Sequence, residues 1–175
     1  MSSYAGEMKI RHAGEADLTR IRAVEVAAGA PFADLGMDLV AGDEPISRER
    51  LSEFVVAGHA WVVADDRDRA VAYLLVESVD GLAHVEQVSV CPDHAGHGLG
   101  ADLIENVAAW ARRHGYPAMT LTTYVDVPWN GPYYERLGFR YLPVSEETAG
   151  LRTIRAAERD HGLDRWPRAC MRREL

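Results

Sequence analysis

Three glycines stand at alternate positions where an apolar run gives way to a helix-type pattern, in the segment from His84 to Ala101. Gly96, Gly98 and Gly100 leave the backbone uncovered, so its N–H groups can point into one concavity. The first turn of the following helix adds N–H groups without intrahelical partners and the positive end of the helix dipole. This combination favours a phosphate or pyrophosphate ligand, and a loop that only turns tightly into a helix is the alternative.

The residues around the glycines narrow the choice of phosphate ligand. A P-loop requires lysine followed by serine or threonine, and neither follows Gly98 or Gly100. Gly96-x-Gly98-x-x-Ala101 formally matches a relaxed dinucleotide fingerprint, with Asp126 after the next predicted strand. Residues 91–95 separate the preceding strand from the glycines, however, whereas the dinucleotide turn is tight. The pattern therefore favours a phosphate ligand other than a dinucleotide.

Two motifs resemble those of the GNAT superfamily of N-acetyltransferases. Residues 95–100 are similar to its Arg/Gln-x-x-Gly-x-Gly/Ala signature at the start of the central helix. Ala95 replaces the polar first residue, which removes one contact to pyrophosphate and leaves the backbone amides in place. Residues 134–139 resemble the family's Tyr-x-x-x-Gly-Phe segment near the acetyl site, and Asn130 precedes them as is usual there. The order of the predicted elements also matches, so the resemblance covers nearly the whole chain.

The resemblance implies a fold and an acyl donor. The fold would be α+β, with a mixed, mostly antiparallel sheet of six to seven strands, splayed between the fourth and fifth strands and flanked by helices. Acetyl-coenzyme A would enter that opening, with its pantetheine arm along the backbone of Val88 and Val90 and its thioester carbonyl facing the Val88 N–H. The implied cofactor-binding residues are Val88, Val90, Ala95, Gly96, His97, Gly98, Leu99, Gly100, Ala101, Asn130 and Tyr133. No metal is expected, because His94 and His97 lack a third ligand at a usual spacing.

Acetyl transfer to an amine requires a group that accepts a proton. A primary amine has a pKa of about 10, so it arrives protonated and cannot attack a thioester. Glu86 is the candidate base, since it shares a predicted strand face with Val88 and Val90. A structural carboxylate and a substrate anchor are the alternatives for Glu86, and His84 on the same face is the reserve base.

The thiolate that departs also needs a proton. The resemblance implies direct attack by the amine in a ternary complex, after which Tyr134 would protonate the leaving group. Packing of Tyr134 against Phe139 in the core is the alternative role.

The acceptor side is weakly specified by the sequence. In the resembling family it is built from the first two helices and their loop, here residues 29–47, with the tail after Tyr141. That loop carries four acidic residues that would suit a cationic acceptor, although a solvent-exposed loop explains them equally: Asp34, Asp38, Asp43 and Glu44. The expected substrate-binding residues are Phe32, Asp34, His84, Tyr124 and Trp129, whose aromatic members could form a wall beside a cation. A small-molecule amine is favoured over a peptide, and its identity stays open.

Hydrophobic periodicity predicts the elements that must position these residues. Helical spacing covers residues 18–29, 47–57, 98–114, 131–137 and 145–161, and a loop is expected at 31–45. Strand-type runs cover residues 8–12, 60–64, 70–79, 82–90, 118–124, 139–142 and 169–174. The short polar turns at 65–69 and 80–81 can join only antiparallel neighbours. The helix between residues 90 and 118 predicts a right-handed crossover to a parallel strand.

Composition fits a single domain over residues 1–175, with 47% hydrophobic residues and no apolar run of membrane-spanning length. The segment Met1–Lys9 lacks the apolar core of a secretion signal, so a cytoplasmic protein is expected. Cys91 and Cys170 fit reduced thiols. A net charge of −8 disfavours a nucleic-acid partner and is compatible with a cationic small molecule. A homodimer is left open.

Three classes of function remain. An acetyl-CoA-dependent amine N-acetyltransferase is the first. The second is a dinucleotide-dependent oxidoreductase, which tight NAD binding without coenzyme A binding would favour. The third is a non-catalytic acyl-CoA sensor, which would keep the glycine loop and tolerate loss of Glu86 and Tyr134.

Overall fold

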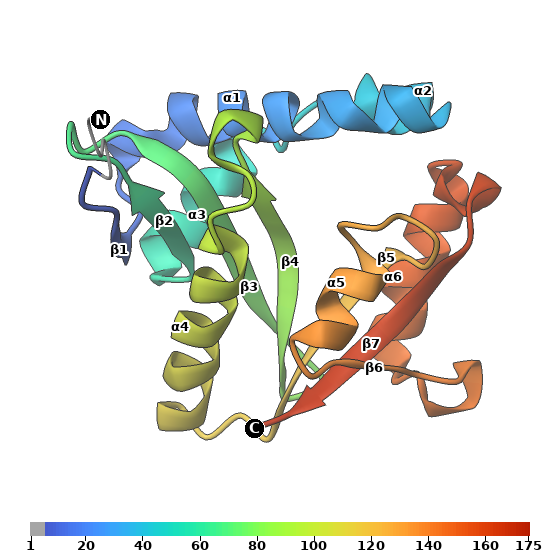
Figure 1. Ribbon diagram of the computed structural model, residues 1–175. Helices are drawn as coiled ribbons and strands as arrows, with labels where there is room; N and C mark the ends of the chain where they lie inside the picture. Colours follow the sequence, from blue (N-terminus) through green and yellow to red (C-terminus); the bar gives the residue numbers. More distant parts are fainter. Residues whose placement is uncertain (1–5) are drawn as a thin grey trace. The chain divides into compact units, whose positions relative to one another are not determined.

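A seven-stranded sheet organises the part of the chain that the computed structural model describes, residues 6–175 (Figure 1). Residues 1–5, which begin the predicted domain of residues 1–175 and the segment Met1–Lys9, lie outside the described residues. The strands are β1 Lys9–His12, β2 Ala60–Ala64, β3 Ala70–Val79, β4 Leu82–Val90, β5 Ala118–Tyr124, β6 Arg140–Tyr141 and β7 Arg168–Glu174. The α-helices are α1 Leu18–Gly29, α2 Asp38–Ala41, α3 Arg48–Ala57, α4 Leu99–Arg113, α5 Gly131–Arg136 and α6 Ala149–Asp160. Short 3-10 helices lie at η1 Glu15–Asp17, η2 Ala30–Leu35, η3 Pro92–His94, η4 Val144–Glu146 and η5 Leu163–Arg165.

The sheet is mixed, as the sequence predicts. Its strand order is β1-β2-β3-β4-β5-β7-β6, and β1–β2, β2–β3, β5–β7 and β6–β7 pair antiparallel. The strands β4 and β5 are parallel, which confirms the predicted parallel pairing. Their register comprises two pairs, Ala83 with Met119 and His84 with Thr120. So short a ladder agrees with the expectation that the fourth and fifth strands part.

Contacts divide the chain into two compact units. The first unit holds the residues up to Val76 and residues Glu86–Asn106. The second unit holds residues Glu77–Val85 and Val107–Leu175. The strands β3 and β4 and the helix α4 contribute to both units. The single-domain assignment for residues 1–175 stays a prediction.

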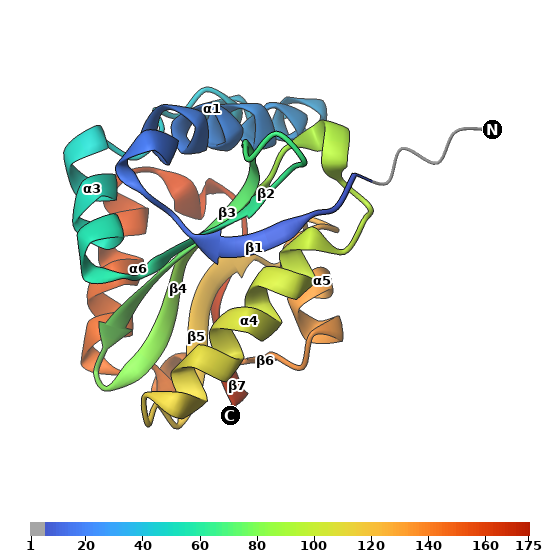
Figure 2. The same ribbon diagram turned by 90° about the vertical axis from the view of Figure 1, so that its left-hand side faces the viewer.

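The core of the first unit forms where two amphipathic helices cover one face of β2 and β3. Alternate strand residues, including Val62 and Tyr73, pack with residues at helical spacing such as Ile21 of α1 and Leu51 of α3. The helix α3 begins where the Ser47 side chain accepts a hydrogen bond from the Arg50 N–H at 3.1 Å, as predicted for an N-cap. Figure 2 shows α1 and α3 on one side of these strands and α4 on the other.

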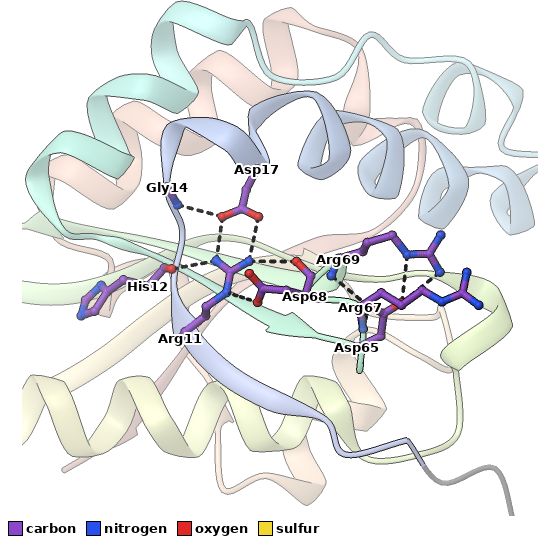
Figure 3. Close-up of polar contacts among 8 residues, drawn as sticks. All are labelled: Arg11, His12, Gly14, Asp17, Asp65, Arg67, Asp68 and Arg69. Carbon is purple, nitrogen blue, oxygen red and sulfur yellow. Dashed lines mark hydrogen bonds and ion pairs between the residues drawn. The ribbon is translucent and has the colours of Figure 1, made fainter.

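A polar cluster closes the edge of the first unit (Figure 3). The Arg11 guanidinium of β1 binds both carboxylate oxygens of Asp17 at 2.8 and 3.0 Å and the Asp68 carboxylate at 2.8 Å. Asp65 accepts hydrogen bonds from the N–H groups of Arg67 and Arg69 and so shapes the β2–β3 turn. The turn at 65–69 is therefore bound to β1 through Asp68.

The second unit is built on β7, which pairs with β5 along its whole length (Figure 1). Behind this pair, Leu151 and Ile154 of α6 pack against Leu142 and Cys170. The side chain of Thr148 accepts from the Leu151 N–H and caps α6, so the helix begins after residue 148 rather than at the predicted residue 145. No helix within residues 6–175 combines the length and apolarity needed to cross a bilayer.

Two further expectations need correction. The predicted loop at 31–45 contains the short helices η2 and α2, because segments of four to six residues are too short for a periodic signal. Gly36, at a φ of 71°, separates these two helices. The predicted strand at 139–142 is limited to Arg140–Tyr141.

Candidate active site

The glycine loop lies between η3 and the first turn of α4. Gly96 and Gly98 adopt φ angles of +79° and +76°, a left-handed conformation that a side chain disfavours. A Cβ atom at either position would meet no atom within 4 Å, so the loop surface there is open. The helix begins at Leu99, and its first intrahelical bond runs from the Asp102 N–H to the Gly98 carbonyl at 3.0 Å. The N–H groups of the preceding turn are thus available to an anion.

The residues within this loop differ in exposure. Residues 95–98, which include His97, are exposed, whereas Leu99 and Gly100 are buried and anchor the helix start, and Ala101 is half-buried. His94 is half-buried, and its Nδ1 is enclosed without a hydrogen-bond partner among the described residues. Within residues 6–175, no group of three or more His, Cys, Asp and Glu side chains has an arrangement that could hold a metal ion.

The strand β4 passes from buried to partly exposed residues at Glu86. His84 and Val85 are buried, whereas Glu86 is exposed and Val88 and Val90 are half-buried. The Gln87 side chain donates to the Ser89 hydroxyl at 3.0 Å on the opposite face of the strand. The half of β4 that belongs to the first unit therefore presents the exposed Glu86 and the half-buried residues Val88 and Val90, which are the predicted base and pantetheine contacts.

A pocket of about 270 Å³ opens beside Glu86, entirely within the first unit. It lies between α1, α3, the segment before α3, and the strands β3 and β4. The lining residues are Glu25, Glu44, Ile46, Arg50, Tyr73, Leu75, Glu86 and Gln87. Of the predicted site residues, the pocket includes Glu86 together with Glu44 from the acidic loop.

Glu25 is the most enclosed carboxylate of the pocket. One of its oxygens accepts a hydrogen bond from the Ile46 N–H at 3.0 Å. Burial raises the pKa of Glu25, and the nearby charge of Asp43 adds to the increase, while the Ile46 N–H, Tyr73 and Arg22 oppose it. The Tyr73 hydroxyl lies beside Glu25 and Ser89, yet it is buried without a hydrogen bond of standard geometry among the described residues. Burial and the Glu25 charge raise the Tyr73 pKa, so this hydroxyl stays protonated.

Arg50 is the cation among the lining residues, and its guanidinium also contacts two residues outside the pocket. Its Nη1 donates to the Glu53 carboxylate at 2.7 Å, and Glu53 lies outside the pocket. Its guanidinium also lies 4.5 Å from the centre of the Phe54 ring. Negative charge therefore exceeds positive charge among the lining residues.

His84 belongs to the second unit and is 2% exposed. Its Nδ1 lies 2.9 Å from the Thr120 hydroxyl of β5. Burial lowers the pKa of His84 to about 4, so the imidazole is neutral at physiological pH. Its proposed use as a reserve base or substrate contact stays a prediction.

Tyr134 and its neighbours also lie in the second unit. The Tyr134 ring contacts Phe139 edge to face, with centroids 6.0 Å apart, and Tyr133 at 5.5 Å. Burial raises the Tyr134 pKa, with a smaller contribution from Tyr133, so the hydroxyl keeps its proton at neutral pH. Asn130 precedes α5, and its side-chain oxygen accepts from the Thr123 hydroxyl at 3.1 Å. This geometry is compatible with both roles predicted for Tyr134, proton donor and core packing.

The other expected acceptor contacts lie apart from the pocket lining. Phe32 and Asp34 are on η2, where Phe32 is half-buried and Asp34 is exposed. In the second unit, Tyr124 is buried with the Arg168 guanidinium 4.2 Å from its ring centre, and Trp129 is 41% exposed. Their assignment to the substrate is not tested by these positions.

Sequence reasoning missed six residues of the pocket lining, the apolar Ile46 and Leu75 and four polar ones: Glu25, Arg50, Tyr73 and Gln87. Glu25 left a usable signal, because it is a charged residue within the helical repeat that places Ile21 and Val24 in the core. Tyr73 left none, since an aromatic residue in an apolar strand is ordinary core.

Comparisons with known proteins identify the family. Residues 31–139 match the model of the acetyltransferase (GNAT) family. A GNAT-family acetyltransferase from Staphylococcus aureus Mu50 aligns with a TM-score of 0.74 at 10% identity, over 97% of this chain and 99% of that one. The PaiA N-acetyltransferase of Thermoplasma acidophilum, solved with coenzyme A, gives 0.70 at 12% identity over 97% and 99%.

A third structure is larger than this protein. The N-acetylglutamate synthase of Neisseria gonorrhoeae, solved with coenzyme A and N-acetylglutamate, gives a TM-score of 0.69 at 17% identity. The alignment covers 97% of this chain and 35% of the synthase. At these identities the structural likeness shows the fold alone. The family model, in contrast, spans more than half of the sequence, and this chain therefore belongs to the acetyltransferase (GNAT) family.

Proposed function

We propose that this protein is an N-acetyltransferase that transfers the acetyl group of acetyl-coenzyme A to a primary amine of a small molecule. The amine would attack the thioester directly in a ternary complex. The observation that carries the proposal is the open glycine loop, with Gly96 and Gly98 in left-handed conformations at the start of α4. Family membership supports the reaction class.

The residues of the loop fit the donor that the family implies. The backbone of the exposed residues 95–98 and the N–H groups of the first turn of α4 would hold the pyrophosphate. The backbone of Val88 and Val90 would pair with the amides of the pantetheine arm. Ala95 supplies no polar side chain, so binding rests on backbone donors.

Glu86 would accept the proton of the amine. Its side chain is exposed on β4 and lines the pocket, so it can meet a ligand that enters from solvent. The pocket volume of about 270 Å³ suits a small ligand. The excess of carboxylates favours an ammonium group over a neutral or anionic acceptor.

Tyr134 would donate a proton to the departing thiolate. Its raised pKa supports this role, because the hydroxyl keeps the proton until a strong base forms beside it. The role itself rests on the family resemblance of residues 134–139.

The glycine loop is tested by replacing Gly98 with valine. A valine must adopt the left-handed φ of +76° and would cover the N–H groups that bind the pyrophosphate. Gly58→Val is a matched control. Gly58 has a φ of +73°, a Cβ atom there would also meet no atom within 4 Å, and the residue lies at the end of α3, away from the glycine loop in the sequence. Calorimetry should show coenzyme A affinity reduced at least about tenfold by Gly98→Val and little changed by Gly58→Val. Equal affinities in the two folded variants would refute the pyrophosphate site.

A further inference from the structure

Two side chains of α1 bind the backbone of Ile46, the residue just before the N-cap of α3. Glu25 accepts a hydrogen bond from the Ile46 N–H at 3.0 Å, and the Nε of Arg22 donates to the Ile46 carbonyl at 2.9 Å. The two side chains lie on one face of the helix, because they are three positions apart. Ile46 lies outside the helices and strands, so these side chains replace the partners that regular structure would give its backbone. We call the two bonds the Ile46 clamp.

The Ile46 clamp closes a loop at residues 30–45. This loop continues directly from the end of α1, forms η2 and α2, and returns to α1 at Ile46. It also has contacts of its own, since Met37 is buried and its N–H donates to the Phe32 carbonyl at 3.1 Å. Compact surface loops whose ends are joined in this way are frequently functional.

The closed end of the loop forms part of the pocket beside Glu86. Glu44 and Ile46 line the pocket, and so does Glu25, which holds Ile46 in place. The Tyr73 hydroxyl and the Arg22 charge both act on the Glu25 carboxylate. Its interactions are therefore directed at the protein, and its place in the pocket is explained by the segment that it holds.

We propose that Arg22 and Glu25 are positioning residues, which hold Ile46 so that residues 44–46 complete the pocket for the amine. The inference rests on the proposed N-acetyltransferase activity for what the pocket binds. Neither residue acts on the reacting atoms. A loop released from α1 would spend part of its time away from the pocket, and the apparent affinity for the amine falls with the fraction that stays in the binding conformation.

Arg20 provides a matched control on the same helix. Its Nε donates to the Ala70 carbonyl at 2.8 Å, so Arg20→Met and Arg22→Met each remove one bond from an arginine Nε to a backbone carbonyl. Ala70 begins β3 and lies outside the pocket lining. The KM for the amine should rise about three- to tenfold in Arg22→Met, with kcat and coenzyme A affinity near normal. In Arg20→Met the KM should stay within about twofold of the unmodified value.

The probe amine for these rates is whichever of butylamine, phenethylamine and putrescine the unmodified protein acetylates fastest. Coenzyme A binding by each variant reports folding. Arg22→Lys keeps a cationic donor and should recover part of the affinity that Arg22→Met loses. Equal KM values in Arg20→Met and Arg22→Met would overturn the positioning role of Arg22.

Two variants of Glu25 separate its hydrogen bond from its charge. Glu25→Gln keeps an oxygen that accepts the Ile46 N–H, so the KM should stay within about twofold of the unmodified value. Glu25→Met removes the acceptor and should raise the KM about three- to tenfold. A loss in Glu25→Gln as large as that in Glu25→Met would assign Glu25 to the charge of the substrate and overturn its positioning role. If Arg22→Met does not fold, this pair still decides.

Hydrogen exchange tests the Ile46 clamp without any amine. Peptides from residues 30–46 should exchange faster in Arg22→Met and Glu25→Met than in Arg20→Met or the unmodified protein. Unchanged exchange in both variants would overturn the clamp, and faster exchange with an unchanged KM would overturn its effect on the pocket. If the unmodified protein acetylates none of the three amines, the proposed function fails for these acceptors, and exchange decides the clamp by itself.

Discussion

Two clusters of charged side chains in this protein are organised in opposite ways. In the second unit, Arg155 binds both oxygens of Asp164 at 2.9 and 3.1 Å, and Arg168 binds Glu158 at 2.7 Å. Cations and carboxylates are equal in number there, and Thr122 adds a hydroxyl that donates to Glu158. In the pocket of the first unit, carboxylates outnumber the single arginine of the lining.

The difference separates a structural role from a functional one. Charges that neutralise one another hold α6, η5 and β7 in place. Carboxylates in excess around an open pocket favour a cationic ligand, and burial raises the pKa of Glu25 among them. The predictions that follow test this distinction at one cluster or the other.

The largest expected effect is at Glu86. Glu86→Gln keeps the size of the side chain and removes its ability to accept a proton, so kcat/KM at the pH plateau should fall about 10²–10⁴-fold. Raising the pH should restore part of the activity, because free amine becomes more abundant. Coenzyme A affinity should stay near normal. A loss confined to KM for the amine would instead make Glu86 an anchor for the substrate cation.

A comparable loss is expected at Tyr134. Tyr134→Phe keeps the ring that contacts Phe139 and removes the proton, so kcat should fall about 10²–10⁴-fold with the fold intact. Pre-steady-state kinetics must first establish that the chemical step limits the rate. A kcat within about threefold of the unmodified enzyme would show that Tyr134 is not the proton donor and only packs in the core. Tyr133→Phe would then test whether the adjacent tyrosine donates the proton.

Substitutions in the cluster of Arg155, Asp164, Arg168 and Glu158 should change the free energy of unfolding and leave the rate of catalysis unchanged. Arg155 is 7% exposed and pairs with Glu158, whose side chain is 12% exposed, and with the more exposed Asp164, so Arg155→Met should lower the free energy of unfolding by about 1–3 kcal/mol. The control is Arg140→Met, because the pair of Arg140 with Glu146 is exposed on both sides and is worth less than about 1 kcal/mol. Urea unfolding measures both. Equal losses in the two variants would contradict the view that burial sets the value of these pairs.

A smaller effect follows from His84 and pH. The His84 pKa is about 4 in the folded chain and about 6.5 in a free histidine. Above pH 6.5 the imidazole is neutral in both states, so stability is unaffected. As the pH falls below 6.5, the unfolded chain binds a proton that the folded chain refuses, and stability decreases until about pH 4. Between pH 7 and pH 5 the loss should be about 2 kcal/mol, as measured by urea unfolding, and His84→Gln should remove most of it. An unchanged pH slope in that variant would place the effect elsewhere.

The elements of the fold could be predicted because local signals agree along the chain. The strands β2, β3 and β4 have the predicted bounds, since short polar turns at 65–69 and 80–81 interrupt apolar runs. The start of α4 could be placed from its glycines, and the start of α3 from Ser47. The helices η2 and α2 could not, because they are too short to show a period.

The site was less accessible to sequence reasoning. The glycine loop and Glu86 were found because each lies on one continuous segment. The pocket requires Glu25 of α1 and Tyr73 of β3 to meet, and this depends on how the helix packs on the sheet. His84 shows the converse limit, since alternation on β4 cannot show that the strand passes from a buried to an exposed environment between residues 84 and 86.

The central claim is tested most directly by incubating the purified protein with acetyl-CoA and pools of small amines. Thiol release is followed together with mass spectrometry of the amine products. The account predicts release of coenzyme A in equal amount with an N-acetylated amine, at a rate that Glu86→Gln strongly reduces. Tight coenzyme A binding without any N-acetylated product in any pool, or thiol release without amide formation, would contradict it.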